Sequence, residues 1–288
     1  MTTPLWEEGI ALSRCTTIGT GGPAARFARP ASLAALEQLV QVAAAEGLPL
    51  ATIGLGSNLL AADEGVGGIV LRLEGELAAV HVEGERLVAG GGAANAVCLH
   101  AARGASLGGL EFACAIPGTI GGGIAMNAGA YGSDFALTVE RALVMTADGA
   151  DWLGANDLAF AYRTSAIRPG WVVARAELRL ERRGGDTIRR VIRALVAERK
   201  ATQPTNRRTF GSVFKNPAGE RGAGALVEAC GLKSLRVGGA LISPVHANFI
   251  ENAGGATTAD CLAVIAEARR RVRDEFGVEL ETEVRLLG

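Results

Sequence analysis

The glycine content constrains the possible folds of this chain more than the content of any other residue type does. Forty of its 288 residues are glycine, about twice the usual share of roughly 7%. The glycines gather in short segments, and the densest segment, 116–132, holds six of them in 17 residues. Because glycine has no side chain, such a segment lets the backbone lie close against a ligand. The sequence therefore predicts a binding protein with glycine-built loops.

Composition and charge narrow the choice of partners. Apolar residues make up 49% of the chain and the net charge is −1, so we expect an ordinary globular protein that binds neither nucleic acid nor membrane. The five cysteines are an odd number without a C-x-x-C spacing, which argues against a disulfide framework and a metal site. The chain shows no signal-peptide pattern and no run of about 18 apolar residues. We predict a cytoplasmic protein.

The order of elements predicts an α+β fold with two domains. A helix and a strand are expected over 30–54, and the charged turn ERRGGD at 181–186 predicts a domain break near residue 184. Residues 105–134 fit neither helix nor strand. The other expected elements are a strand at 68–73, a hairpin around Glu83 and Gly84, a helix near 94–103, strands at 139–147 and 171–180, helices from 188 and 262, and a final strand over VELETEVRLL at 278–287.

Two glycine motifs are candidates for ligand contact. In IGLGSNLL at 53–60 a strand runs into a loop whose N–H groups can cradle a pyrophosphate, although a plain tight turn is the alternative. No G-x-G-x-x-G opens a helix, so a Rossmann site is not indicated. In IPGTIGGGIAMNAGAYG at 116–132 the backbone can lie against a cofactor, and a buried turn without a ligand is the alternative.

Six motifs occur in a fixed order and carry a resemblance. After the two glycine motifs come YRTS at 162–165, GSVFKNP at 211–217, HANFIEN at 246–252 and LETEV at 280–284. From about residue 14 to the end, the chain resembles the UDP-N-acetylenolpyruvoylglucosamine reductase family, in its shorter subtype. The resemblance implies a two-lobed FAD-binding domain of the vanillyl-alcohol-oxidase (PCMH) type at 1–184 and a smaller α+β substrate-binding domain at 185–288.

The resemblance also implies an activity. The expected reaction is the NADPH-dependent reduction of UDP-N-acetylglucosamine enolpyruvate to UDP-N-acetylmuramate in peptidoglycan precursor synthesis, through non-covalently bound FAD in a monomer. Hydride addition to the enolpyruvyl group leaves negative charge beside the substrate carboxylate, which must be stabilised and protonated. By resemblance Arg163 binds the carboxylate, a protonated Glu283 donates a hydrogen bond to the enolate-like oxygen, and Ser212 protonates the carbon.

Further contacts follow from the same motifs. Those implied for FAD are Gly54, Gly56, Ser57, Asn58, Pro117, Gly118, Thr119, Gly122 and Asn127. Those implied for the nucleotide sugar are Tyr131, Lys200, Lys215, Asn216 and His246. The chain departs from the family pattern at Thr164, Pro244 and Val245, which puts substrate affinity in doubt more than reaction type.

Alternatives stay open at this point. Taken singly, Arg163 reads as a surface cation, Ser212 as a turn residue and Glu283 as a solvated acid. One competing function is a flavin oxidase of the same superfamily with another substrate, against which GSVFKNP and LETEV argue. Another is a non-catalytic sugar-nucleotide-binding protein, against which the three retained catalytic residues argue. The preference for NADPH over NADH comes from the resemblance alone.

Overall fold

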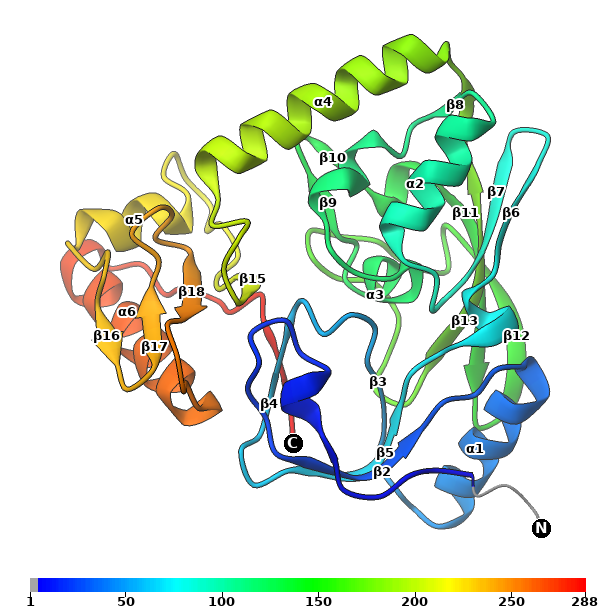
Figure 1. Ribbon diagram of the computed structural model, residues 1–288, viewed down its shortest axis with the longest axis horizontal. Helices are drawn as coiled ribbons and strands as arrows, with labels where there is room; N and C mark the ends of the chain where they lie inside the picture. The colour runs from blue at the N-terminus through cyan, green and yellow to red at the C-terminus, as the bar shows by residue number, and fades with distance from the viewer. Residues whose placement is uncertain (1–4) are drawn as a thin grey trace. The chain divides into compact units, whose positions relative to one another are not determined.

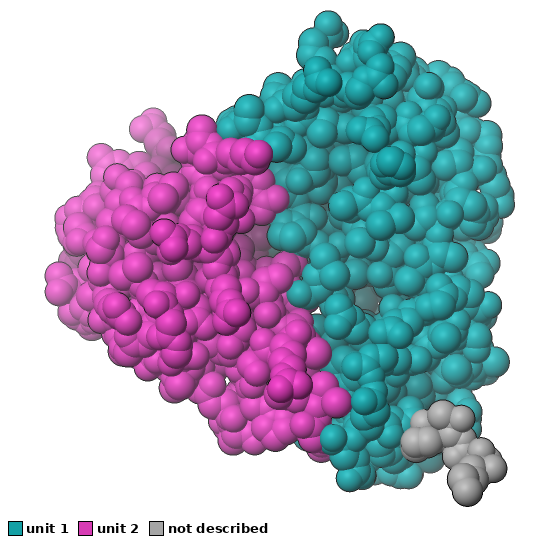
Figure 2. All heavy atoms as spheres, viewed as in Figure 1, with its two compact units in different colours: residues 1–8, 26–55, 67–198 teal, residues 9–25, 56–66, 199–288 magenta. Residues whose placement is uncertain are grey.

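The computed structural model describes residues 5–288, and they divide into two compact units. Figure 2 colours the first unit teal and the second magenta. The first comprises residues up to Glu8 together with Arg26–Leu55 and Gly67–Glu198, and the second comprises Gly9–Ala25, Gly56–Val66 and Arg199–Gly288. Neither unit is one continuous segment. The predicted domain break near residue 184 stays a prediction.

A five-stranded antiparallel sheet forms the centre of the first unit (Figure 1). Its order is β12-β11-β13-β7-β6, and the turn between β6 and β7 confirms the hairpin predicted around Glu83 and Gly84. The strands are β6 Val80–Glu83, β7 Arg86–Gly90, β11 Val139–Thr146, β12 Gly149–Gly154 and β13 Val172–Arg179.

Helices cover both faces of this sheet because apolar side chains alternate along its strands. From β11, Ala142 and Val144 pack into one core with residues of α2 (Asn95–Gly104) and α3 (Ile120–Ala125). Met145 points the other way and packs with α1 (Leu33–Ala45). The predicted helices over 30–54 and near 94–103 are therefore confirmed, and each contributes to a different face.

A second sheet leads into the first glycine motif. Its order is β1-β2-β5-β3, with β3 parallel to β5. The strands are β1 Ile10–Ala11, β2 Pro23–Ala28, β3 Leu50–Thr52 and β5 Val66–Leu71. Because β3 ends at Thr52, it delivers Ile53 and Gly54 directly to the loop that follows.

Residues 105–134 are more regular than their composition predicts. They include α3, in which three of six residues are glycine. The helix begins because the Thr119 hydroxyl caps it and accepts the N–H of Gly122. Glycine is needed at 123, where a Cβ would lie 2.4 Å from a ring carbon of Phe135. Short pieces accompany it: β8 Leu107–Gly108 paired with β14 Glu181–Arg182, and β9 Gly129–Ala130 paired with β10 Ser133–Asp134.

The second unit is an antiparallel sheet packed on helices. Its order is β15-β18-β17-β16, and α6 (Thr258–Phe276) covers it through Val264, Ala268 and Val272. Other elements of this unit are β15 Thr209–Ser212, α5 Ala223–Ala229, β16 Arg236–Val237, β17 Ala240–Ile242, β18 Phe249–Asn252 and a 3-10 helix at Leu12–Arg14.

The first unit contains several further elements. Helix α4 (Gly185–Thr202) belongs to it as far as Glu198, and short 3-10 helices lie at Gly75–Ala78, Glu111–Ala115 and Phe135–Leu137.

The predicted final strand over 278–287 is only partly correct. Only β19 (Arg285–Leu287) is a strand, and it pairs in parallel with β4 (Leu59–Ala61). Residues 281–284 instead run irregularly beside 213–215. There the Lys215 N–H donates to the Glu281 carbonyl at 2.9 Å and the Glu283 N–H donates to the Val213 carbonyl at 2.8 Å. Glu283 thus lies in a non-strand segment just before β19.

Candidate functional site

The first unit holds a pocket of about 90 Å³ where the first glycine loop meets α3. A Cβ on Gly54 would lie 2.5 Å from the Thr119 hydroxyl oxygen, and a Cβ on Gly91 would lie 1.8 Å from the Val173 carbonyl oxygen. A side chain at 54 would collide with another lining residue and one at 91 with the neighbouring strand β13, so the backbone positions around the pocket depend on glycine. Its lining consists of Thr52, Ile53, Gly54, Leu55, Arg72, Leu73, Gly91, Gly92 and Thr119.

Sequence reasoning missed part of this lining. It singled out Gly54 and Thr119 but neither Arg72 nor the glycine run at 90–92. The available signal was three consecutive glycines that begin at the last residue of β7, a place where backbone often approaches a ligand. Arg72 follows β5 and carried no sequence signal of its own.

Hydrogen bonds fasten the YRTS segment to the second glycine motif within the first unit. The Arg163 guanidinium donates to the Gly129 carbonyl at 2.8 Å, and the Ser165 hydroxyl donates to the Ala125 carbonyl at 3.0 Å. The Asn127 side-chain amide donates to the Ala161 carbonyl at 3.1 Å. Two motifs that are separate in sequence therefore form one structure.

Backbone strain is concentrated in the same place. Asn127, Tyr131 and Arg163 have φ values of 39°, 55° and 57°, in the left-handed region that non-glycine residues rarely adopt. Such conformations cost about 1–3 kcal/mol each and cluster at functional sites. The strain supports a binding role for this region.

The position of Arg163 is closely fixed. Ala161 and Thr164 exchange backbone hydrogen bonds of 3.1 and 3.2 Å, which places Arg163 in a tight turn. Its guanidinium lies 5.1 Å from the centre of the Tyr162 ring, a cation–π contact. The Tyr131 hydroxyl donates to the Leu195 carbonyl of α4 at 3.2 Å. A guanidinium held in this way can offer a fixed fork to a carboxylate.

In the second unit, three motifs meet around Ser212 and Glu283. Ser212 ends β15, and a Cβ on the preceding Gly211 would lie 3.4 Å from the Ser57 carbonyl oxygen. The Asn58 side-chain amide donates to the Glu283 carbonyl at 3.1 Å. The residues predicted from GSN, GSVFKNP and LETEV are therefore neighbours.

A buried asparagine holds this cluster in shape. Asn248 accepts the Phe214 N–H through Oδ1 at 2.9 Å and donates through Nδ2 to the Phe214 carbonyl at 2.8 Å. His246 accepts the Asn248 N–H at Nδ1, at 3.1 Å. Burial lowers the pKa of His246, which favours the neutral ring that this acceptor role requires. HANFIEN thus positions GSVFKNP.

The other predicted residues have varied surroundings. Lys215 contacts the Glu281 carboxylate at 2.5 Å, and Asn216 accepts the first N–H of α5, from Ala223, at 3.0 Å. Lys200 is exposed in the last turn of α4. Gly56 has φ +65° and packs against the backbone of Cys15. The Gly118 carbonyl, next to Pro117, accepts the N–H of Asn95.

Comparison with known proteins decides the family. Residues 203–287 match the C-terminal domain of UDP-N-acetylenolpyruvoylglucosamine reductase, and residues 24–150 match an FAD binding domain. The reductase of Anaeromyxobacter dehalogenans is 49% identical over 95% of this chain and 83% of its own length. That of Bacillus licheniformis is 40% identical over 98% and 93%. The chain belongs to the UDP-N-acetylenolpyruvoylglucosamine reductase family.

A solved structure of this reductase family agrees. The crystal structure of the reductase (MurB) from Thermus caldophilus matches with a TM-score of 0.87 and 35% identity, over 98% of this chain and all of the other. The predicted α+β fold with an FAD-binding domain and the predicted flavoprotein oxidoreductase class are confirmed. Every residue that lines the glycine pocket falls inside the 24–150 match. A cradle that a Cβ would fill fits a cofactor lying against the backbone.

Proposed function

We propose that this reductase converts UDP-N-acetylglucosamine enolpyruvate to UDP-N-acetylmuramate with NADPH as reductant, for peptidoglycan precursor synthesis. One observation carries the proposal. Ser212 and Glu283, chosen from motifs far apart in sequence, lie close together in the second unit. The Glu283 N–H donates to the carbonyl of Val213, the residue after Ser212, and the Glu283 carbonyl accepts the side-chain amide of Asn58 from the first glycine motif. A surface turn serine and a solvated acid would not require this arrangement.

Each catalytic residue has a separate task in the proposed reaction. FAD, once reduced, supplies the hydride that adds to the terminal carbon of the enolpyruvyl group. Arg163 binds the substrate carboxylate and stabilises the charge that develops beside it. Glu283 in its protonated form donates a hydrogen bond to the enolate-like oxygen, and the Ser212 hydroxyl gives a proton to the carbon.

The nucleotide sugar is assigned to a second set of residues. We propose that it contacts Tyr131, Lys200, Lys215, Asn216 and His246. The departures from the family pattern bear on its affinity, because Val245 is 51% exposed next to His246 and Thr164 closes the Arg163 turn. The FAD contacts proposed beyond the pocket lining are Gly56, Ser57, Asn58, Pro117, Gly118, Gly122 and Asn127.

The proposed enzyme is a cytoplasmic monomer with small-molecule partners. It holds FAD without a covalent bond, since His81 and His100 occur in no motif that resembles a flavin-linking site, and His81 contacts Glu83. NADPH and the UDP-sugar use one open face of the flavin in turn, so kinetics are ping-pong. No helix within residues 5–288 has the length and apolar character needed to cross a membrane.

Ser212→Ala tests the proposed reaction. The hydroxyl has no part in the reduction of FAD by NADPH, so anaerobic bleaching of the flavin should proceed at close to the original rate. Reoxidation by the enolpyruvyl substrate should slow by about 10²–10⁴-fold, the usual effect of losing a general acid. Ser13→Ala is the control, because Ser13 is also partly buried in the second unit but lies in none of the motifs.

The two half-reactions give clear alternatives. Wild-type reoxidation in Ser212→Ala, with an intact flavin spectrum, would mean that another group protonates the carbon. A wild-type protein that NADPH bleaches and the enolpyruvyl substrate fails to reoxidise would point to the flavin-oxidase alternative. Protein that binds the UDP-sugar but is not bleached by NADPH would indicate the non-catalytic binding protein.

A further inference from the structure

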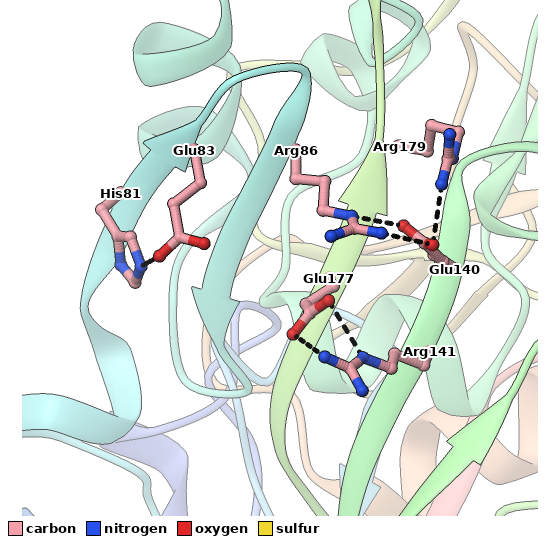
Figure 3. Close-up of polar contacts among 7 residues, drawn as sticks. All are labelled: His81, Glu83, Arg86, Glu140, Arg141, Glu177 and Arg179. Atoms are coloured by element: carbon pink, nitrogen blue, oxygen red, sulfur yellow. Dashed lines mark hydrogen bonds and ion pairs between the residues drawn. The ribbon is translucent and has the colours of Figure 1, made fainter.

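Arg72 differs from Arg86, Arg141 and Arg179 of the first unit, which all form ion pairs. On the central sheet, Arg86 and Arg179 both hold the Glu140 carboxylate at 2.8 Å, and Arg141 holds Glu177 at 2.8 Å (Figure 3). The Arg72 guanidinium has no hydrogen-bond or ion-pair partner in the part of the chain that the structure describes. Its backbone N–H alone is bonded, to the Ala28 carbonyl at 2.9 Å. A half-buried cation without a partner is costly unless a ligand pairs with it.

Arg72 lines the glycine pocket together with several groups that can donate hydrogen bonds. The lining contains no Asp or Glu among residues 5–288, while Thr52 and Thr119 contribute hydroxyl groups. The amides of Gly54 and Leu55 form no hydrogen bond within the described residues. A cation and several donors around a small space, with no carboxylate to neutralise them, attract an anion.

We propose that Arg72 binds the pyrophosphate of FAD in this pocket and thereby favours FAD over flavins without that group. The planar guanidinium fork matches two phosphate oxygens at once. FAD, NADPH and the UDP-sugar all carry a pyrophosphate, so the chemistry of the pocket alone does not say which of the three molecules supplies the group that Arg72 binds. FAD is the one selected, because every lining residue lies within the match to the FAD binding domain.

Flavin binding to the apoprotein tests the assignment. FAD and riboflavin are titrated by fluorescence into wild type, Arg72→Met and Arg190→Met. Arg190 is the matched control, since it is exposed on α4 and also lacks a partner among the described residues. We expect Arg72→Met to raise the Kd for FAD by about 10- to 100-fold, as loss of a charged hydrogen bond does. Its Kd for riboflavin should stay at the wild-type value, and Arg190→Met should change neither.

Two further arms sharpen the test. Arg72→Lys keeps the charge but loses the fork, so its FAD affinity should fall between wild type and Arg72→Met. Added salt should weaken FAD binding more in wild type than in Arg72→Met. Circular dichroism of the apoprotein shows whether Arg72→Met folds. If it does not, the proposal is tested with Arg72→Lys alone, and unchanged FAD affinity in that variant contradicts the proposal.

Other outcomes overturn the assignment. Equal losses for FAD and riboflavin would show that Arg72 shapes the pocket without contacting phosphate. Unchanged FAD affinity, with weaker binding of NADPH or UDP-N-acetylglucosamine to the holoenzyme, would assign Arg72 to another pyrophosphate. The inference rests on the FAD-binding domain and not on the proposed substrate, and its readouts are binding constants. Its failure would therefore leave the Ser212 proposal standing, and the reverse also holds.

Discussion

The two units build their candidate sites in opposite ways. In the first unit the pocket exists because atoms are missing, since a Cβ on Gly54 or Gly92 would collide with another lining residue, Thr119 or Leu73. In the second unit the cluster around Ser212 exists because side-chain amides are present. Asn248 holds Phe214 at both of its backbone groups, and Asn58 holds Glu283.

This contrast predicts which kind of substitution each site cannot tolerate. A site made of bare backbone should tolerate the loss of side-chain atoms and fail when atoms are added. A site made of amide bonds should fail when atoms are removed, because buried backbone groups then lose their partners. Four predictions test this contrast, and they are ordered by the size of the effect that we expect.

Gly91→Ala should have the largest effect. The added methyl group would lie 1.8 Å from the Val173 carbonyl oxygen, so the fold should lose about 3 kcal/mol of unfolding free energy together with most of its FAD affinity. Gly104→Ala is the control, because nothing lies within 4 Å of that position in α2. It should be neutral or stabilise by up to about 1 kcal/mol. Urea unfolding of the apoproteins measures both, and equal stabilities would refute the bare-backbone account.

Asn248→Ala should come next. It leaves the N–H and carbonyl of Phe214 buried without partners, which should cost about 2 kcal/mol and slow substrate turnover more than FAD reduction. Asn156→Ala, at an exposed position in the first unit, should be silent in the same unfolding assay. If the two variants prove equally stable, the amide bonds do not hold the second site together.

Removing the two threonine caps compares the units directly. Thr119 caps α3 and lines the pocket, while Thr257 caps α6 through a capping box. Each change to alanine should cost about 1 kcal/mol in thermal or urea unfolding. FAD affinity should fall only in Thr119→Ala. A similar loss of FAD affinity in Thr257→Ala would show that the caps act through global stability and not locally.

Glu140→Gln should have the smallest effect, and it should depend on pH. Hydrogen bonds from Arg86 and Arg179 lower the pKa of Glu140 from 4.5 to about 2. A depressed pKa in the folded state stabilises the protein above pH 4.5, and this contribution is lost as pH falls towards 2. The difference in unfolding free energy between wild type and variant should be about 1 kcal/mol or less at pH 7, because the pair is close to solvent. A difference that grows on acidification would have the wrong sign.

Each site was readable from sequence in part. Gly54 and Thr119 of the pocket lining lie in motifs that the sequence singled out, whereas Arg72, Gly91 and Gly92 do not. Ser212 and Glu283 of the second site also lie in such motifs. Helix α3 was not predicted, because its three glycines, of which Gly123 is needed for packing against Phe135, obscure the helical pattern. The extent of the last strand was wrong because apolar alternation cannot tell a ladder from an irregular run beside 213–215.

Long-range placement also lay beyond sequence patterns. Nothing local in residues 9–25 or 56–66 indicates that they belong to the same compact unit as residues 199–288. Arg72 was missed for a similar reason. Its significance comes from its place in a pocket whose lining, among residues 5–288, contains no Asp or Glu, which only three-dimensional packing reveals.

The interleaved make-up of the second unit has a consequence for synthesis on the ribosome. Residues of β4 emerge early, but β19, their parallel partner, is at the very end of the chain. Asp63 likewise lacks its partners until α6 has been synthesised, because it accepts the N–H groups of Thr258 and Ala259 in the first turn of that helix. At roughly 5–20 residues per second, these early segments spend tens of seconds exposed to the cell. Until residues 285–287 have been made, β4 therefore lacks the strand with which it pairs in the folded protein.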